Sequence, residues 1–269
     1  GESLKGRVLA IAGSDSGGGA GIQADIKTIT ALNAYAATAV TALTAQNTQG
    51  VHAIHGVPES FIAEQIRVVL EDIGADAVKI GMLHRPGIIA VVARCLRELV
   101  PGMPVIVDPV MVAKGGAKLL HDDAHQALVD ELLPLATVLT PNVPEAEALS
   151  GMAIADEAGM AAAAARLRDM GASAVLMKGG HMVGEAVVDL LLDGCGRHHF
   201  TAPRLDTRHT HGTGCTLASA IAAGIAQGLP LTAAVARAHA YVHAAILRAP
   251  GFGQGHGPLN HAHPLEVAS

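Results

Sequence analysis

The sequence is poor in aromatic residues and in charge. Its 269 residues include no Trp, 2 Tyr and 3 Phe, and charged residues make up 16% of the chain, with a net charge of −6. Five aromatic side chains cannot build a stacking platform for single-stranded nucleic acid. A net negative chain also lacks the basic surface that holds a phosphate backbone. We therefore expect no nucleic-acid partner.

Cysteines are few, and long apolar runs are missing. Cys95, Cys195 and Cys215 are an odd number without CxxC spacing. This pattern argues against a disulfide framework or a structural zinc site and is typical of the reducing cytoplasm, where we expect the protein. No run of about 18 residues is free of polar interruption, and residues 1–7 contain no apolar signal core. Neither a membrane span nor a secretion signal is predicted.

Half of the residues are hydrophobic, which is unlike a disordered chain. Short apolar runs ending in Gly, Asp, Asn or Pro alternate with longer segments of helical periodicity. The predicted strands cover residues 8–12, 38–43, 77–80, 105–107, 137–139, 174–177 and 186–192. The predicted helices cover residues 22–32, 59–73, 87–99, 124–133, 144–149, 157–170, 213–227 and 231–247. The alternation predicts an α/β fold, with a mostly parallel sheet covered by helices on both faces, and the lack of linkers predicts one domain over residues 1–269.

Ligands of open parallel sheets bind beyond the carboxyl ends of the strands. The first predicted strand is followed by residues 13–21, which include five glycines that allow the backbone to approach a ligand. A simple tight turn would explain the same glycines. Residues 19–24 fit a loose dinucleotide fingerprint, but Asp25 follows at once and the next carboxylate is Glu59. The ribose carboxylate expected about 20 residues on is missing, which argues against a nicotinamide-dependent dehydrogenase.

The segment Gly212-Thr213-Gly214-Cys215 lies directly before a predicted helix. Its backbone N–H groups, together with the helix dipole, can form an anion-binding site. The positive electrostatic potential at the start of a helix also favours a thiolate, so we predict a lowered pKa for Cys215. An ordinary helix start with a buried thiol is the alternative.

Three further strand ends carry oxygen ligands or a cation. Asp108 follows residues 105–107, Asn142 and Glu145 follow residues 137–139, and Lys178 follows residues 174–177. Two oxygen ligands together with water and phosphate oxygens suit Mg²⁺, and a lysine among glycines suits a phosphate. A dipole contact for Glu145 and a solvent-reaching head for Lys178 are the structural alternatives. Together these groups are the parts needed for phosphoryl transfer from ATP, although no P-loop or protein-kinase signature is present.

Four motifs together resemble the ribokinase-like superfamily. They are Asp-Pro-Val-Met at 108–111, Thr-Pro-Asn-x-x-Glu at 140–145, Lys-Gly-Gly-His at 178–181 and Gly-Thr-Gly-Cys at 212–215. The segments 11–25, 41–51 and 79–83 are similar to the bacterial hydroxymethylpyrimidine/phosphomethylpyrimidine kinases of thiamine biosynthesis. The resemblance extends from residue 8 to about residue 258.

This resemblance implies a ribokinase-like sheet of about eight or nine strands, ATP and Mg²⁺ as cofactors, and a cytoplasmic homodimer. The implied reaction phosphorylates 4-amino-5-hydroxymethyl-2-methylpyrimidine to its monophosphate and then to the diphosphate. A pyridoxal or pyridoxine kinase of the same fold is the nearest alternative, because both acceptors are flat nitrogen heterocycles with a hydroxymethyl group. A non-catalytic ligand-binding domain is disfavoured by the complete set of Lys178, Glu145 and residues 212–215.

The resemblance also implies a role for individual residues. The catalytic residues are Lys178, Gly212, Thr213, Gly214 and Cys215, with Cys215 as the base toward the acceptor hydroxyl. The pyrimidine contacts are Gln46, Asp25, Gly13, Met82 and Val110, and the carboxamide of Gln46 complements an aminopyrimidine edge. The ATP contacts are Lys178, Asn142 and Thr213, and the Mg²⁺ ligands are Asp108 and Glu145. Two positions depart from the pattern: His239, where lysine is expected, and Gly115, where serine is frequent.

Overall fold

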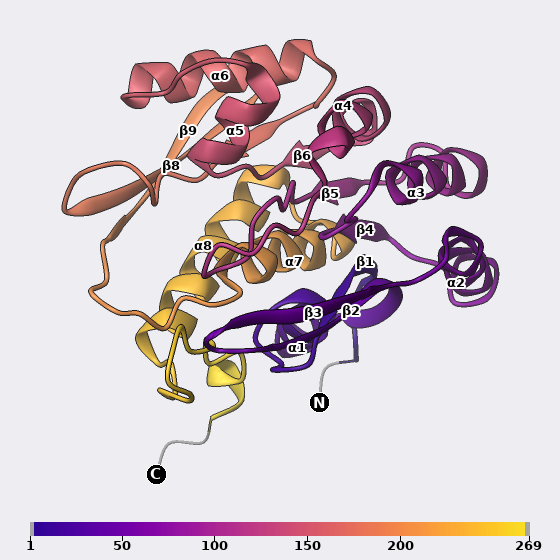
Figure 1. The fold of residues 1–269 in the computed structure, drawn as a ribbon. Helices are drawn as coiled ribbons and strands as arrows, with labels where there is room; N and C mark the ends of the chain where they lie inside the picture. The colour runs from indigo at the N-terminus through magenta and orange to yellow at the C-terminus, as the bar shows by residue number, and fades with distance from the viewer. Residues whose placement is uncertain (1–2, 267–269) are drawn as a thin grey trace.

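The centre of the fold is a nine-stranded sheet, seen in a computed structural model that describes residues 3–266 (Figure 1). The strand order is β3-β2-β1-β4-β5-β6-β7-β8-β9. The strands are β1 (Arg7–Asp15), β2 (Tyr35–Asn47), β3 (Gly50–Gly56), β4 (Ala77–Ile80), β5 (Val105–Val107), β6 (Val138–Leu139), β7 (Val175–Met177), β8 (Ala186–Asp193) and β9 (Gly196–Pro203).

The sheet is mostly parallel, as the sequence predicts. Five of the eight neighbouring pairs are parallel, joining β2, β1, β4, β5, β6 and β7. The antiparallel pairs lie at the two ends, where β3 pairs with β2 and the β8–β9 hairpin pairs with β7. The strands β3 and β9 were not predicted from the sequence. The parallel strands place their carboxyl ends along one edge, where a ligand site is expected.

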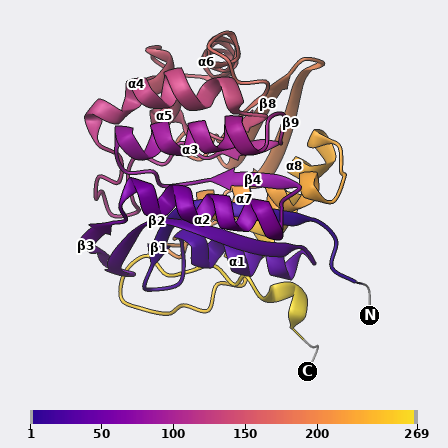
Figure 2. The ribbon, with the colours of Figure 1, turned by 90° about the vertical axis from the view of Figure 1, so that its right-hand side faces the viewer.

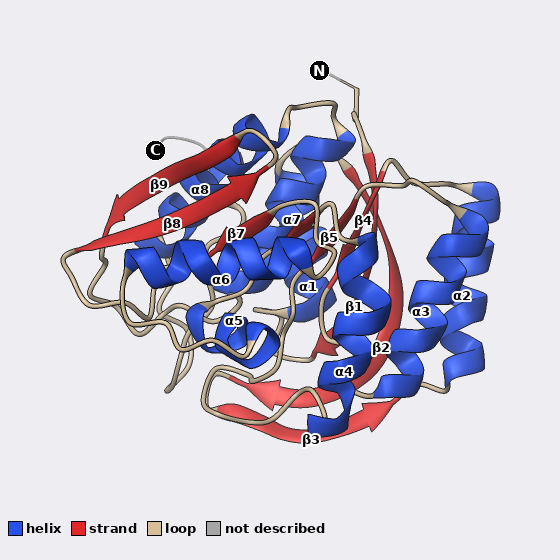
Figure 3. Ribbon diagram, turned by 90° about the horizontal axis from the view of Figure 1, so that it is seen from above, coloured by secondary structure: helices blue, strands red, loops and turns tan. Residues whose placement is uncertain are grey.

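Helices cover both faces of the sheet (Figure 3). They are α1 (Gly21–Ala31), α2 (Glu59–Asp72), α3 (Pro86–Leu99), α4 (His125–Ala127), α5 (Val143–Ser150), α6 (Glu157–Asp169), α7 (Thr213–Ala226) and α8 (Leu231–Leu247). One face packs against α1, α7 and α8, and the other against α2 to α6. Figure 2 shows α2 and α3 side by side on the second face.

Consecutive residues of the buried strands enter two separate cores. In β4, the side chain of Ala77 packs on the α1/α7/α8 face, whereas Val78 packs on the opposite face. Successive side chains of a strand point to opposite faces, so a strand covered on both sides is apolar throughout. This explains why the predicted strands show no alternation of polar and apolar residues.

The single regular helix predicted at residues 124–133 is wrong, because this segment is built from several short helical pieces. The chain forms a 3₁₀ turn (Asp122–Ala124), the short α4, a π segment (Leu128–Leu132) and a second 3₁₀ turn (Leu133–Leu135). Pro134 lacks a backbone N–H and cannot continue a regular helix. The other predicted helices begin and end within one residue of the observed helices. Within residues 3–266, no helix is both long and apolar enough to cross a membrane.

Candidate active site

A cavity of about 560 Å³ opens at the carboxyl ends of the parallel strands. It brings together residues from Ala12 to Ile246, because neighbouring parallel strands end at the same edge. All but one of the site residues predicted from the sequence line this cavity: Gly13, Gln46, Met82, Asp108, Val110, Asn142, Glu145, Lys178, Gly212, Thr213, Gly214 and Cys215. The exception is Asp25.

The glycine loop after β1 is organised by Asp15, which the sequence analysis did not single out. The buried Asp15 carboxylate accepts hydrogen bonds from the backbone N–H groups of Gly17, Gly19 and Ala20, at 2.7, 3.0 and 2.8 Å. Its Oδ2 also lies 2.9 Å from Nε2 of His211. Burial raises the pKa of the Asp15 carboxyl, but the hydrogen bonds from His211 and the loop amides outweigh it, so this pKa lies below its usual value. The sequence contains a signal for this role, because an aspartate directly before a glycine run can accept hydrogen bonds from the free backbone N–H groups of that run.

The loop before α7 packs directly on this glycine loop. Gly212 has a φ of +83°, and a Cβ at this position would lie 1.8 Å from the carbonyl oxygen of Gly19. Only glycine allows this close approach. The helix α7 begins at Thr213, so the N–H groups of Gly214 and Cys215 belong to its first turn and lack intrahelical acceptors. Both residues line the cavity, so their N–H groups are available for the predicted anion-binding site.

Lys178 and Asp108 lie beside this first turn. Lys178 Nζ is 3.6 Å from Asp108 Oδ1, and a Cβ on Gly214 would lie 3.1 Å from the same Nζ. Burial lowers the pKa of Lys178, but the carboxylates of Asp108, Glu145 and Asp189 outweigh it and raise this pKa overall. Lys178 is therefore a charged group placed beside the first turn of α7.

Glu145 and Asn142 form a capping box at the start of α5. Asn142 Oδ1 accepts from the Glu145 N–H at 2.8 Å, and Glu145 Oε1 accepts from the Asn142 N–H at 2.9 Å. Burial raises the pKa of Glu145 to about 7, with Lys178 opposing the rise and Asp108 reinforcing it. Glu145 therefore has the structural role at a helix N-terminus that the sequence analysis gave as an alternative. It also lines the cavity.

Two carboxylates, Asp108 and Glu145, are the metal-ligand candidates of the cavity. No group of three or more His, Cys, Asp or Glu side chains that could hold a metal ion exists within residues 3–266. Mg²⁺ prefers six oxygen ligands and commonly takes several from water and nucleotide phosphates. The donor set therefore fits a metal that arrives with a nucleotide, and it does not fit a metal held by protein ligands alone.

The prediction of a lowered pKa for Cys215 is wrong. Burial raises the pKa of this thiol to about 11; the charge of Lys79 opposes the rise, and the carboxylates of Asp25 and Asp108 reinforce it. The first turn of a helix favours a thiolate, but here the loss of hydration is the larger effect. The thiol is protonated at neutral pH.

Asp25 lies beneath the cavity rather than in its wall. Its side chain is fully buried, and its Oδ1 accepts hydrogen bonds from Lys79 Nζ, at 2.8 Å, and from Ser219 Oγ. Lys79 is equally buried and comes from β4, on the face that packs against α1 and α7. Its carboxylate is turned inward to form this ion pair, so Asp25 does not line the cavity in which a pyrimidine contact was predicted for it.

Further basic side chains that the sequence analysis did not assign line the cavity. Lys114 and His181 line the cavity together with Lys178 and Arg204. The guanidinium of Arg204 donates to the carbonyl oxygens of Gly180, Met182 and Gly184 at 2.8, 2.6 and 2.9 Å. Arg204 therefore fixes the loop after β7, while Lys114 and His181 remain available to a ligand.

His239 also lies at the cavity, on α8. Its Nε2 is 3.6 Å from Asp189 Oδ2, and Asp189 Oδ1 accepts the backbone N–H of Gly179 at 2.9 Å. This chain of contacts supports the turn that follows Lys178. The wall next to His239 is apolar and is formed by Val187, Ala202, Leu217, Val242 and Ile246. At position 239, where the family resemblance predicts a lysine, the cavity is thus lined by a histidine.

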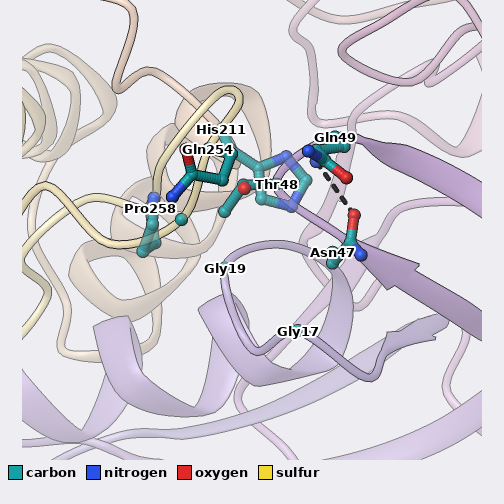
Figure 4. A pocket seen from close by; sticks show the side chains of 9 residues that line it. Gly17, Gly19, Asn47, Thr48, Gln49, His211, Gln254 and Pro258 are labelled. Atoms are coloured by element: carbon teal, nitrogen blue, oxygen red, sulfur yellow. Dashed lines mark hydrogen bonds between the residues drawn. The ribbon is translucent and has the colours of Figure 1, made fainter.

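A second cavity, of about 280 Å³, lies beside His211 (Figure 4). It separates the β2–β3 turn, with Asn47 and Gln49, from the loop that carries Gln254 and Pro258. This loop also donates hydrogen bonds to Thr48, from the backbone N–H of His256 to its carbonyl oxygen at 2.7 Å and from that of Gly255 to its Oγ1 at 3.1 Å. Residues 255–256 therefore hold the β2–β3 hairpin, which carries Gln46, by hydrogen bonds to Thr48.

A family model described as Phosphomethylpyrimidine kinase matches residues 15–260. The chain belongs to this family. A hydroxymethylpyrimidine/phosphomethylpyrimidine kinase of Rhizobium meliloti is 53% identical over 95% of this chain and 96% of its own length. The thiamine biosynthesis bifunctional protein ThiED of Geobacter sulfurreducens is 54% identical over 96% of this chain, which spans about half (52%) of that relative's length. The family resemblance drawn from the motifs is confirmed.

Solved structures confirm the expected fold. The ADP complex of Bacillus subtilis pyridoxal kinase is 38% identical and superposes with a TM-score of 0.89, covering 96% of this chain and 98% of that one. A phosphomethylpyrimidine kinase from Clostridium difficile is 42% identical, with a TM-score of 0.81, covering 90% of this chain and 100% of that one.

Proposed function

We propose that the chain is an ATP-dependent kinase of thiamine biosynthesis. It phosphorylates the hydroxymethyl group of 4-amino-5-hydroxymethyl-2-methylpyrimidine and then phosphorylates the monophosphate to the diphosphate. One observation carries the proposal: a single cavity joins a phosphate-binding end, with Lys178 and the first turn of α7, to an end lined by Gln46, Met82 and Val110. The membership of the phosphomethylpyrimidine kinase family supports it.

The end lined by Gln46 suits a flat heterocycle. Gln46 donates one hydrogen bond, to Thr44 Oγ1 at 2.7 Å, which leaves its carbonyl oxygen and one N–H for a ligand. An aminopyrimidine edge offers the complementary donor and acceptor. A Cβ on Gly13 would lie 2.8 Å from the sulfur of Met82, so the two residues pack closely and form an apolar wall.

The phosphate end suits transfer of a phosphoryl group. Phosphoryl transfer passes through a loose transition state in which positioning and charge neutralisation dominate. Lys178 and the N–H groups of Gly214 and Cys215 meet the charge of the transferred group. Asp108 and Glu145 would hold Mg²⁺ together with phosphate oxygens of the nucleotide, and Asn142 and Thr213 would contact the nucleotide. When bound, Mg²⁺ neutralises phosphate charge.

Cys215 lines the same cavity, in the first turn of α7. Because its thiol is protonated at neutral pH, we assign it the role of orienting the acceptor hydroxyl by hydrogen bonding, not the role of a preformed thiolate base. This role requires a polar side chain at position 215 and does not require a low pKa.

A pyridoxal kinase is the second candidate, because pyridoxal kinases from two organisms share the fold closely. The Staphylococcus aureus enzyme in complex with AMP-PCP and pyridoxal is 34% identical, with a TM-score of 0.88, and covers 97% of this chain and 94% of that one. The pyrimidine kinases compared with this chain are more similar in sequence, at 42–53% identity against 34–38% for the pyridoxal kinases. This difference favours the pyrimidine as the acceptor.

An ADP-release assay with four acceptors tests the proposal: the pyrimidine alcohol, its monophosphate, pyridoxal and pyridoxine. We expect turnover of both pyrimidine acceptors, and loss of both activities in Lys178→Met. Preference for pyridoxal without turnover of the pyrimidine monophosphate would establish the second candidate instead. We also propose that the enzyme is a homodimer, which light scattering of the purified protein tests.

A further inference from the structure

The two acceptors of the proposed reaction differ by one phosphate group, which carries about two negative charges near neutral pH. A cavity that accepts both must offer a cation to the phosphate. Lys178 is already balanced, with its Nζ 3.6 Å from Asp108 Oδ1. Three of the five N–H donors of Arg204 bind backbone carbonyl groups, which holds its guanidinium against the loop after β7. The remaining lysine of the cavity is Lys114.

Lys114 lies in a small hairpin that begins just after Val110, a residue of the acceptor end. The hairpin is closed by a bridge between Val112 and Lys118 and by a 2.7 Å hydrogen bond from the Ala113 N–H to the carbonyl oxygen of Ala117. The next residue after Lys114, Gly115, has a φ of +95°. This positive φ turns the chain back directly after Lys114.

The hairpin reaches across the acceptor end to the strand pair that carries Gln46. A Cβ on Gly115 would lie 3.8 Å from the carbonyl oxygen of Gln49, in the β2–β3 turn. Lys114 lies directly before this glycine, in a turn that approaches the hairpin carrying Gln46, and it is exposed. It shares the cavity with Lys178, which marks the place of the transferred phosphoryl group.

Lys114 has no anionic partner in the part of the chain that the structure describes. Its ammonium makes neither an ion pair nor a hydrogen bond within residues 3–266. Loss of hydration and the charge of Lys178 both lower the pKa of Lys114. Lys114 is thus a cation near a second cation, Lys178, and no carboxylate of the described residues neutralises it. This arrangement favours the binding of an anion between the two lysines.

We propose that Lys114 binds the phosphate group of the monophosphate acceptor and so enables the second phosphorylation. This inference rests on the proposed function. In the second step, an oxygen of the monophosphate forms a bond to the γ-phosphorus of ATP, while the bond from this phosphorus to the β–γ bridging oxygen breaks and ADP leaves with the electron pair. The dianionic phosphate has no proton to lose. The step therefore needs a cation to bring two anions together, rather than a base.

The same hairpin provides a matched control. Lys118 lies four residues further on, pairs with Asp122 at 3.1 Å and does not line the cavity. Lys114→Met and Lys118→Met remove the same charge from the same hairpin, so a difference between them reports the position of the charge. Lys114→Arg keeps the charge and tests rescue.

The experiment measures kcat/KM for the pyrimidine alcohol and for its monophosphate, at saturating ATP, in the wild type and the three variants. We expect Lys114→Met to lower the ratio of the monophosphate value to the alcohol value by about 10-fold or more, the effect of losing one charge-assisted hydrogen bond. Calorimetry without nucleotide should show monophosphate binding weakened by about 10-fold. Lys118→Met should leave both values as in the wild type, and Lys114→Arg should restore most of the ratio.

Several outcomes would overturn the assignment. Equal losses on the two acceptors, an increase confined to the KM for ATP, or an equal effect of Lys118→Met would each show that Lys114 does not serve the acceptor phosphate. Thermal melting of each variant separates these effects from misfolding, and Lys114→Gln, which also removes the charge, carries the test if the methionine variant does not fold. A wild-type protein that phosphorylates neither acceptor would contradict the proposed function itself, whereas an unchanged ratio in Lys114→Met contradicts only the role of Lys114.

Discussion

Asp15 Oδ2 lies 2.9 Å from His211 Nε2, although the two residues are 196 positions apart. The contact joins the glycine loop after β1 to the loop before α7. The same carboxylate accepts three backbone N–H groups of the glycine loop. One buried side chain therefore sets the relative position of two loops that line the cavity.

Replacing Asp15 by Asn should loosen both loops. The amide cannot accept all four hydrogen bonds, and hydrogen bonds to charged groups contribute about 1.5–3 kcal/mol each, so we expect a loss of about 2–4 kcal/mol in unfolding free energy at pH 7. The pKa of Asp15 is lowered by folding. Its stabilising effect is therefore complete above its unfolded pKa, 3.8, and is lost as the pH falls through the lower folded value. Urea unfolding at pH 7 and pH 3 should show the difference between wild type and Asp15→Asn shrinking in acid.

The parallel core of the fold could be predicted from the sequence because buried strands leave a strong signal. Strands such as β4 and β5 are covered on both faces and are apolar at nearly every position. The strands β3 and β9 are only partly buried, and both contain histidines. Their pairing is fixed by the neighbouring strands β2 and β8 rather than by their own composition.

The site residues could be predicted as a group because parallel strands end at one edge. The burial and orientation of individual side chains could not be predicted from the sequence. Asp25 lies on α1 and turns inward because Lys79, on a strand distant in sequence, offers it a buried charge. The pKa of Cys215 depends on how completely the first turn of α7 is covered. Both features arise from tertiary packing, on which the local sequence carries no information.

Gly212 and Gly214 should respond in opposite ways to substitution by Ala. Gly212 has a positive φ and no room for a methyl group, since a Cβ would meet the Gly19 carbonyl oxygen at 1.8 Å. Gly212→Ala should cost at least about 2 kcal/mol of unfolding free energy. Gly214 lies inside α7, where Ala is favoured by up to about 1 kcal/mol.

In Gly214→Ala, however, the added methyl would lie 3.1 Å from Lys178 Nζ, in the space proposed for phosphate. We expect stability to be kept and kcat/KM to fall by about 10- to 100-fold, the effect of displacing a transferred group by about 1 Å. Paired measurements of urea unfolding and turnover check both variants. A stable, fully active Gly214→Ala would contradict the proposed phosphate position.

The buried pair of Lys79 and Asp25 should show strong coupling. Both side chains are fully buried, and Asp25 Oδ2 has no hydrogen-bond partner in the described structure. Removing one partner of a buried ion pair leaves an uncompensated charge and costs about 3–5 kcal/mol. We expect Lys79→Met and Asp25→Asn each to lose this amount.

The double variant Lys79→Met/Asp25→Asn should lose clearly less than the sum of the two single losses, because no charge is left unpaired. A double-mutant cycle by urea unfolding measures the coupling. Additive losses would show that the two side chains do not interact as a charged pair.

Glu145 should make the ligand-free protein less stable as the pH rises. Folding raises the pKa of this carboxyl from 4.5 to about 7. Between these values the folded state binds a proton that the unfolded state has lost, so the unfolding free energy decreases as the pH increases. Relative to Glu145→Gln, we expect the wild type to lose up to about 3 kcal/mol between pH 4.5 and 7 and no more above pH 7. The measurement is urea unfolding in EDTA, and a difference independent of pH would show that the carboxyl is not perturbed.

Cys215 should behave as a protonated thiol. Burial raises its pKa to about 11, and only the thiolate reacts with iodoacetamide. At pH 7.5 we expect the exposed Cys195 to be alkylated well before Cys215, and mass spectrometry of the peptides resolves the two sites. The exposed thiol serves as the internal control. Faster labelling of Cys215 would show a thiolate in the resting enzyme.

The same thiol decides between two roles in catalysis. If it orients the acceptor hydroxyl, Cys215→Ser should keep kcat within about 10-fold of the wild type, because serine preserves a hydrogen bond of that strength. Cys215→Ala should lose more, with little change in the Kd for ATP. A thiolate base with a pKa of about 11 would instead make kcat rise about tenfold per pH unit from pH 7 to 9. Equal inactivity of the serine and alanine variants, together with such a rise, would establish Cys215 as the base.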